Sequence, residues 1–168
     1  MSTTATTYNF GDGAVRAHRH TNPDGSVGGW VADTATVDPS AWIDAYATVS
    51  GYATVSGNAT VSDNATVSGN AWVYGNATVT DEAEVSGDSV VYGNAKVYGR
   101  AYVYNDAVVS GYAKVYGNAR VYGNATVSGN ATVSGNARVY GNAEVSGDAE
   151  IDGRAGLSSG KTEGRLSI

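Results

Sequence analysis

The side chains best suited to metal binding or acid–base chemistry lie near the N-terminus, in the sequence His18-Arg19-His20. Alternate residues of a β-strand point to the same side, so these two imidazoles could contact one transition-metal ion. Three copies of the chain about a three-fold axis could gather such nitrogens around a shared ion. The alternative is a surface segment that precedes the turn Asn22-Pro23-Asp24-Gly25. We favour the surface segment and predict no metal site and no cofactor, with His18 and His20 as the residues to inspect.

A second group with chemical capacity consists of cations and tyrosines that recur at multiples of six residues. Lysine and arginine supply positive charge, and tyrosine rings stack on planar groups, so such residues could hold an anionic or planar ligand. The candidate ligand-binding residues are Lys96, Tyr98, Arg100, Tyr102, Tyr104, Lys114, Tyr116, Arg120, Tyr122, Arg138 and Tyr140. The alternative is a stabilising role, in which stacked tyrosines support exposed strands and the long cations cover them.

A six-residue repeat determines where these side chains stand. From residue 35 to residue 154 the chain divides into 20 consecutive hexapeptides without insertion or deletion, with the consensus Ala-x-Val-x-Gly-Asn. The first position is Ala except at Ser89, and the third is Val except at Ile43 and Ile151. Residues 29–34 form a degenerate unit before this run, and residues 155–160 form a fading one after it.

The repeat predicts a parallel β-solenoid. Ala and Val should point inward and the residue after each should point outward, because side chains alternate along a strand. Gly and Asn supply a tight turn, since both tolerate positive φ. One strand and turn suit one side of a three-sided coil, so 18 residues make a coil and equivalent strands stack about 4.8 Å apart. The 21 units from residue 29 to residue 154 then form one all-β prism of about seven coils.

The pattern resembles the hexapeptide-repeat superfamily of left-handed parallel β-helices, whose best-known members are trimeric acyltransferases. The resemblance covers residues 29–160 and implies left-handed winding, which the period alone does not determine. The acyltransferases carry a catalytic His, often near an inserted loop, whereas this repeat has neither a His nor an insertion. The carbonic-anhydrase branch uses three His as zinc ligands, and this chain has two His in all. We therefore expect a catalytically silent member of the superfamily.

One face of the predicted prism differs from the other two. Between Asp38 and Glu144 its outward strand residues carry no charge. The apolar patch on this face consists of Trp72, Tyr74, Val90, Tyr92 and Val108. A contiguous apolar patch on a soluble protein commonly marks a partner surface, so we predict an oligomer interface here. The resemblance to trimeric acyltransferases favours a trimer.

Composition narrows the remaining possibilities. The chain has 23 Gly and no Cys, so disulfides and thiolate metal sites are excluded. A net charge of −6 argues against binding of nucleic-acid polymers. The N-terminal residues lack the pattern of a secretory signal, and no stretch has the length of a membrane span, so we expect no membrane partner. The expected location is the cytoplasm, or the host cytoplasm for a virus-encoded protein.

We divide the chain into an N-terminal capping segment (1–28), the repeat β-helix (29–154) and a C-terminal cap or tail (155–168). The leading function is that of a non-enzymatic oligomeric solenoid, a structural or binding module. One alternative is a protein that sequesters a nucleotide-like or sugar-like anion, with its tyrosine and cation rows at subunit clefts. The other is an acyltransferase-like enzyme that takes its His from the N-terminal segment.

Overall fold

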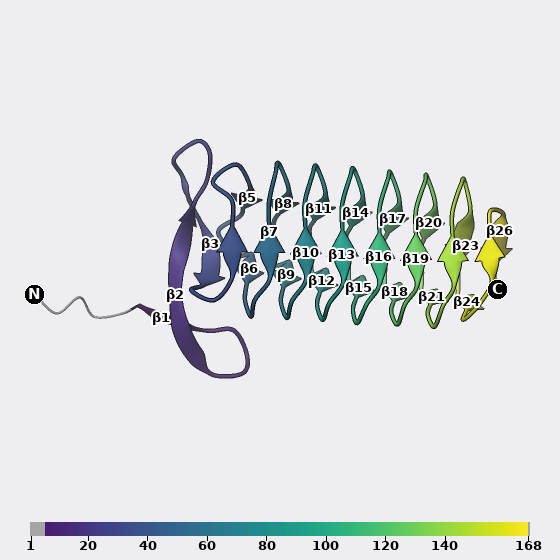
Figure 1. Ribbon diagram of the computed structural model, residues 1–168, viewed down its shortest axis with the longest axis horizontal. Coiled ribbons are helices and arrows are strands. Elements are labelled where there is room, and N and C mark those ends of the chain that lie inside the picture. Colours follow the sequence, from purple (N-terminus) through teal and green to yellow (C-terminus); the bar gives the residue numbers. More distant parts are fainter. Residues whose placement is uncertain (1–5, 168) are drawn as a thin grey trace, which may run out of the picture.

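The computed structural model describes residues 6–167. Over this range the chain forms β-strands and turns and no helix (Figure 1). The strands make three long sheets around one shared hydrophobic interior. The predicted solenoid of about seven coils is therefore confirmed. Within the described residues, no helix has the length and apolar character needed to cross a membrane.

Each coil gives one strand to each sheet. The first sheet consists of β1 (Thr7–Asn9), β2 (Ala14–Thr21), β3 (Val27–Ala32), β6 (Thr48–Val49), β9 (Thr66–Val67), β12 (Glu84–Val85), β15 (Tyr102–Val103), β18 (Arg120–Val121), β21 (Arg138–Val139) and β24 (Gly156–Leu157). The second sheet consists of β4 (Thr36–Val37), β7 (Thr54–Val55), β10 (Trp72–Val73), β13 (Val90–Val91), β16 (Val108–Val109), β19 (Thr126–Val127), β22 (Glu144–Val145) and β25 (Lys161–Thr162). The third sheet consists of β5 (Trp42–Ile43), β8 (Thr60–Val61), β11 (Thr78–Val79), β14 (Lys96–Val97), β17 (Lys114–Val115), β20 (Thr132–Val133), β23 (Glu150–Asp152) and β26 (Arg165–Ser167).

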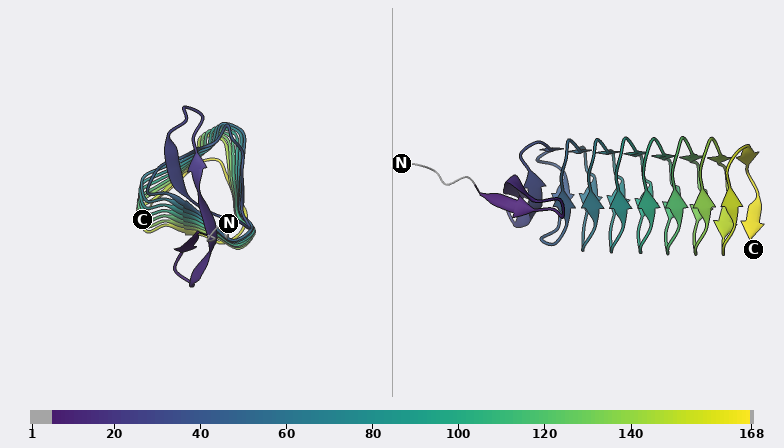
Figure 2. Two further views of the ribbon diagram at one scale, coloured as in Figure 1. Left: turned by 90° about the vertical axis from the view of Figure 1, so that its left-hand side faces the viewer. Right: turned by 90° about the horizontal axis from the view of Figure 1, so that it is seen from below.

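The chain winds as a left-handed coil with a roughly triangular cross-section. In Figure 1 the strands of the second sheet run upward on the near side, and the chain then passes behind them while it advances to the right. The end-on view in Figure 2 shows the sides of the prism stacked coil upon coil. Trp72 of β10 pairs with Val90 of β13, so equivalent residues of adjacent coils lie beside each other in a parallel ladder. The winding implied by the resemblance is the one that the chain adopts.

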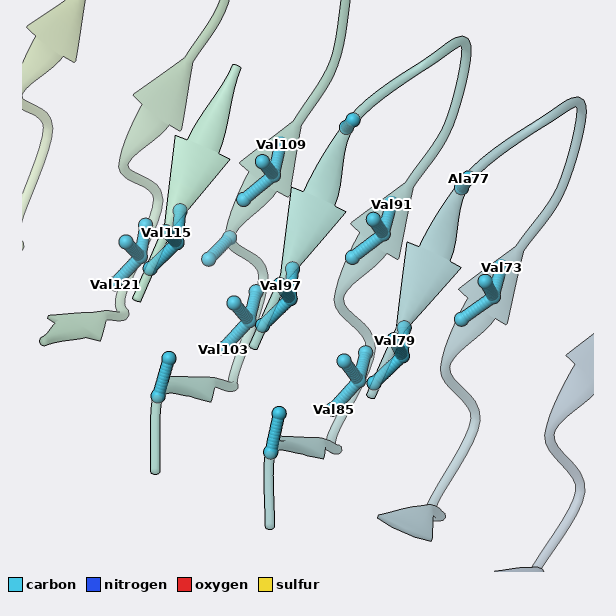
Figure 3. Close-up of a cluster of buried hydrophobic side chains, with 14 of the residues drawn as sticks. Val73, Ala77, Val79, Val85, Val91, Val97, Val103, Val109, Val115 and Val121 are labelled. Atoms are coloured by element: carbon cyan, nitrogen blue, oxygen red, sulfur yellow. The ribbon is translucent and has the colours of Figure 1, made fainter. Parts of the chain in front are cut away.

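The interior is filled by the Ala and Val residues of the first and third repeat positions. Val73, Val91 and Val109 are each 0% exposed and stand in one row along the axis (Figure 3). Small side chains suffice because three sheets face one another across a narrow prism. Ser89 is also fully buried, and its hydroxyl donates to the carbonyl of Ser86 at 2.8 Å, so this departure from Ala carries no unsatisfied donor.

Backbone hydrogen bonds join each coil to the next. The amide N–H of Ser68 donates to the carbonyl of Val85 at 2.9 Å, and that of Asn70 donates to the carbonyl of Gly87 at 2.8 Å. The second of these bonds lies in the turn, so the ladder continues around the corner between two sheets. The turn also requires φ of +67° at Gly69, a conformation that glycine adopts without steric cost. The same corner bond recurs elsewhere, as from the Asn58 N–H to the Gly75 carbonyl at 2.8 Å.

An antiparallel hairpin covers the N-terminal end of the solenoid, where β2 pairs with β3 and β1 pairs with β2 (Figure 2). Two side chains of this region satisfy backbone groups of the first coil. The buried amide of Asn22 accepts a hydrogen bond from the Ile43 N–H at 2.9 Å, and the His20 ring donates from Nε2 to the Ala41 carbonyl at 3.0 Å. These bonds fix the hairpin across the end of the third sheet and occupy strand groups that would otherwise be open to another chain.

The last three described strands continue the three sheets past the final complete hexapeptide. Gly156 of β24 pairs with Arg138, still in the eighteen-residue register. Lys161 of β25 then pairs with Glu144, seventeen residues earlier, and Arg165 of β26 pairs with Glu150, fifteen residues earlier. The coil shortens toward the C-terminus, and the repeat register is lost only after β24. Residue 168, assigned above to the C-terminal cap or tail, lies outside the described residues, as do residues 1–5 of the N-terminal segment.

Candidate binding surfaces

The eleven candidate ligand-binding residues divide between two faces of the prism and one corner. Six lie on the first sheet: Tyr102, Tyr104, Arg120, Tyr122, Arg138 and Tyr140. Four lie on the third sheet: Lys96, Tyr98, Lys114 and Tyr116. Arg100 stands in the turn between these two sheets. The geometry therefore does not gather them into one site.

The first sheet carries a continuous tyrosine stack. Tyr104 and Tyr122 have ring centroids 4.9 Å apart with planes inclined by 4°, and Tyr122 and Tyr140 follow at 5.2 Å and 9°. This spacing is the inter-strand spacing of a sheet, so the in-register repeat alone brings the rings into contact. Burial and the neighbouring Tyr122 raise the pKa of Tyr104 above its usual range. The shift delays ionisation of this hydroxyl only under alkaline conditions, since a tyrosine of ordinary pKa is already protonated at neutral pH.

A hollow of about 440 Å³ opens on the first sheet near the C-terminal end, and we call it the Gly156 hollow. It is lined by Tyr122, Asn136, Arg138, Tyr140, Arg154 and Gly156. The sequence analysis identified three of these residues and missed Asn136, Arg154 and Gly156. The sequence did contain a signal for Gly156. The outward row that contains Arg138 continues to Gly156 one coil later, where the side chain is missing.

A second hollow of about 440 Å³ lies further toward the N-terminus on the same sheet. Its lining includes Tyr102, Tyr104 and Arg120, but also the carboxylate of Glu84. The Arg120 guanidinium lies over the Tyr102 ring at 5.7 Å from its centroid, a cation–π geometry. The mixture of a carboxylate and a guanidinium makes this hollow less suited to an anion than the Gly156 hollow, whose lining has no carboxylate.

On the third sheet the lysines stand at the start of their strands and the tyrosines directly after the end, so the two groups do not form one site. Lys96 and Lys114 are direct neighbours in the ladder and line a hollow of about 320 Å³ with Asn94, Tyr112 and Asn130. Tyr98 and Tyr116 stack on each other at 4.8 Å and 7° and do not line that hollow. Burial, followed by the proximity of Tyr116 and Asp81, raises the pKa of Tyr98.

Arg100 is held by a partner from the preceding coil. Its Nε donates to Glu82 Oε2 at 2.7 Å, and this hydrogen bond raises the pKa of the guanidinium. Both side chains are more than half exposed, so the pair contributes little to stability. Because Glu82 already compensates its charge, Arg100 is poorly suited to bind an anion. Sequence reasoning placed Arg100 among the candidates because it occupies the turn that follows Lys96 and Tyr98.

The predicted apolar patch is contiguous on the second sheet. Trp72, Val90 and Val108 are successive neighbours in the ladder, and the Trp72 side chain is 54% exposed. Tyr74 and Tyr92 stack beside them at 5.1 Å and 6°.

Two further aromatic side chains stand at the borders of the second sheet. Tyr52 and Tyr112 occupy turn positions where the repeat usually has Asn, and they are 71% and 63% exposed. The sequence analysis missed both, although an aromatic residue in a polar turn is itself a signal. Tyr112 lines the hollow of Lys96 and Lys114 on the third sheet, so it does not extend the apolar patch.

The repeat region is similar to one known family. The family model of the YdcK beta solenoid repeat matches residues 53–69, 61–75, 113–129, 119–135 and 127–141. These matches agree with the in-register parallel sheets of the structure. The chain is a hexapeptide-repeat β-solenoid. No curated protein matches it. The matched segments of the solenoid include Arg120 and Arg138 but stop before Arg154 and Gly156.

The solenoid's two histidines lie in different surroundings. His18 is exposed, and its Nδ1 lies 3.0 Å from Asp33 Oδ1, whereas His20 is buried against the Ala41 carbonyl. A register shift between Arg19 and Thr21 interrupts the regular alternation of β2 at this point. Among residues 6–167 no group of three or more His, Cys, Asp or Glu side chains could hold a metal ion together.

Proposed function

We propose that this solenoid is a non-enzymatic structural or binding module that self-associates through its second sheet, as a trimer. The observation that carries the proposal is the exposure of Trp72 in a row of outward strand residues that carry no charge before Glu144. A large aromatic side chain in that position leaves apolar area in water, and burying it against a partner is favourable. The trimer is the arrangement implied by the superfamily resemblance.

The charges on the other faces favour a second copy of the chain as the partner for the second sheet. The first sheet carries neighbouring Arg120 and Arg138, and the third carries neighbouring Lys96 and Lys114. Packing either of those faces against a copy would bring like charges together, which is costly when they are unpaired. The second sheet has no such pair between Asp38 and Glu144. Side chains of this kind stabilise by about 1.5–3 kcal/mol each when buried, so a few per subunit suffice.

The test is the molar mass in solution, measured by light scattering during size-exclusion chromatography. The wild type is expected to run as an oligomer, and Trp72→Glu combined with Val90→Lys is expected to run as a folded monomer. The matched control is Thr60→Glu combined with Thr78→Lys, which places the same charges at equivalent strand positions of the third sheet. This control should keep the wild-type mass. A monomeric wild type, or an oligomer that survives the Trp72 and Val90 changes, would contradict the proposal.

A further inference from the structure

The Gly156 hollow exists because one outward position lacks a side chain. In the ladder of the first sheet, Tyr102 is followed by Arg120, Arg138 and then Gly156. Gly156 is not among the glycines with positive φ, so the backbone there does not require glycine. A Cβ at this position would meet only Tyr140 Cε1 at 3.9 Å and the Arg138 carbonyl at 4.0 Å, which are ordinary contacts. The glycine therefore opens space without being needed for a turn.

Two arginines beside this space have no acidic partner. Within the described residues, neither Arg138 nor Arg154 forms an ion pair with a carboxylate. Arg100 and Arg165, by contrast, are paired, the first with Glu82 and the second with Asp152. Arg19 and Arg120 form no ion pair with a described carboxylate, but each lies over an aromatic ring. Because guanidinium groups are charged at all relevant pH values, the hollow presents two uncompensated positive charges. The amide of Asn136, which also lines it, adds a neutral hydrogen-bonding group.

The same hollow is bordered by the last ring of the tyrosine stack. Tyr140 rests on Tyr122 at 5.2 Å on one side, and the equivalent position in the following coil is Ser158. The contact that a Cβ of Gly156 would make with Tyr140 Cε1 places this ring along the wall of the hollow. A planar group bound there would extend the stack by one step, in the place where the next coil has no aromatic residue.

We infer that the Gly156 hollow binds a phosphate monoester of a molecule that also carries a planar ring, with a nucleoside monophosphate as the representative ligand. A phosphate monoester carries about −1.5 to −2 charges at neutral pH, which matches two guanidinium groups better than a single carboxylate does. Arginine binds phosphate oxygens through paired N–H donors. The ring stacks on Tyr140. The site lies near the C-terminal end of the first sheet, on a different face from the apolar patch (Figure 1), and does not depend on self-association.

The binding test is isothermal titration calorimetry of the full chain at low salt with three probes. Adenosine 5′-monophosphate contains both the phosphate and the ring, adenosine lacks the phosphate, and inorganic phosphate lacks the ring. The monophosphate should bind at least about tenfold more tightly than either part, because charge pairing and stacking act together. Equal affinity for inorganic phosphate and the monophosphate would overturn the stacking role of Tyr140. Absence of binding by the monophosphate would overturn the site.

Three variants then locate the binding. Gly156→Thr fills the hollow with a residue common at this repeat position, while Arg138→Ala and Arg154→Ala each remove one positive charge. Each is expected to weaken binding of the monophosphate by about tenfold or more, with an unchanged circular dichroism spectrum. The matched control is Arg100→Ala, which removes an arginine three coils earlier at the turn position equivalent to Arg154. Unchanged affinity in Gly156→Thr, or an equal loss in Arg100→Ala, would show that the ligand binds elsewhere.

Discussion

At the scale of single residues, the fifth position of the hexapeptide decides how closely two coils can approach. At Gly69 a Cβ would lie 2.7 Å from the Gly87 nitrogen and 2.9 Å from its carbonyl oxygen in the next coil. Asp63 and Asp81 nevertheless occupy equivalent positions with φ of 55° and 62°. The Asp81 carboxylate accepts a hydrogen bond from the Gly99 N–H of the next coil at 2.8 Å, which offsets part of the strain.

Gly69→Ala should therefore lower the free energy of unfolding by about 2 kcal/mol, through the left-handed backbone and the contact with the next coil. Gly69→Asp should cost less, because aspartate tolerates this conformation and its carboxylate can accept the N–H of the following turn. Urea denaturation followed by circular dichroism measures both values. Equal losses in the two variants would mean that the carboxylate hydrogen bond contributes nothing.

The direction of a side chain could be predicted from the sequence only where the six-residue period determines it. The buried Val91 and the exposed Trp72 follow directly from alternation within the hexapeptide, and both are where the sequence predicts them. Turn side chains are different, since their direction depends on the next coil and not on a strand. The pairing of Arg100 with Glu82 and the contribution of Arg154 to a hollow therefore needed the structure.

At the scale of elements, each strand from β4 to β22 contributes only two residues to its ladder, so the side-chain stacks outside the prism are long compared with these strands. Tyr98 on the third sheet and Tyr104 on the first are partly buried within such stacks. Burial, and then the adjacent tyrosine, raises the pKa of both hydroxyls above the ordinary value of 10.0. The stacks thus link tyrosine ionisation to the integrity of the sheets.

Alkaline pH should weaken the fold through these two tyrosines. The folded state holds their protons more tightly than the unfolded chain, so their stabilising contribution is complete below the unfolded pKa of about 10 and is lost as the pH rises through the higher folded-state pKa. Ultraviolet titration of tyrosinate should show a phase that ionises later than in the denatured chain. Tyr98→Phe combined with Tyr104→Phe should remove that late phase. Persistence of the phase in this double variant would assign it to other tyrosines.

At the scale of the whole molecule, the coil is the unit of construction. Deleting residues 47–64 removes β6, β7 and β8, one strand from each sheet, and leaves every remaining residue in register. The shortened chain should fold and be about 4.8 Å shorter by small-angle X-ray scattering. Deleting residues 47–61 instead removes a length that is not a multiple of the hexapeptide and should prevent folding of the prism. Two deletions that fold equally well would show that register is not the controlling factor.

The eighteen-residue register ends after β24, where the last coil shortens. The length of the regular part of the solenoid is therefore a whole number of inter-strand intervals. Between β3 and β24 the first sheet steps through seven inter-strand intervals, a separation of about 34 Å at the usual spacing. A partner that contacts both the hairpin and the Gly156 hollow must span that distance, which can change only in steps of one interval. Adding or removing whole coils would therefore change the distance between the two ends without altering the residues at either end.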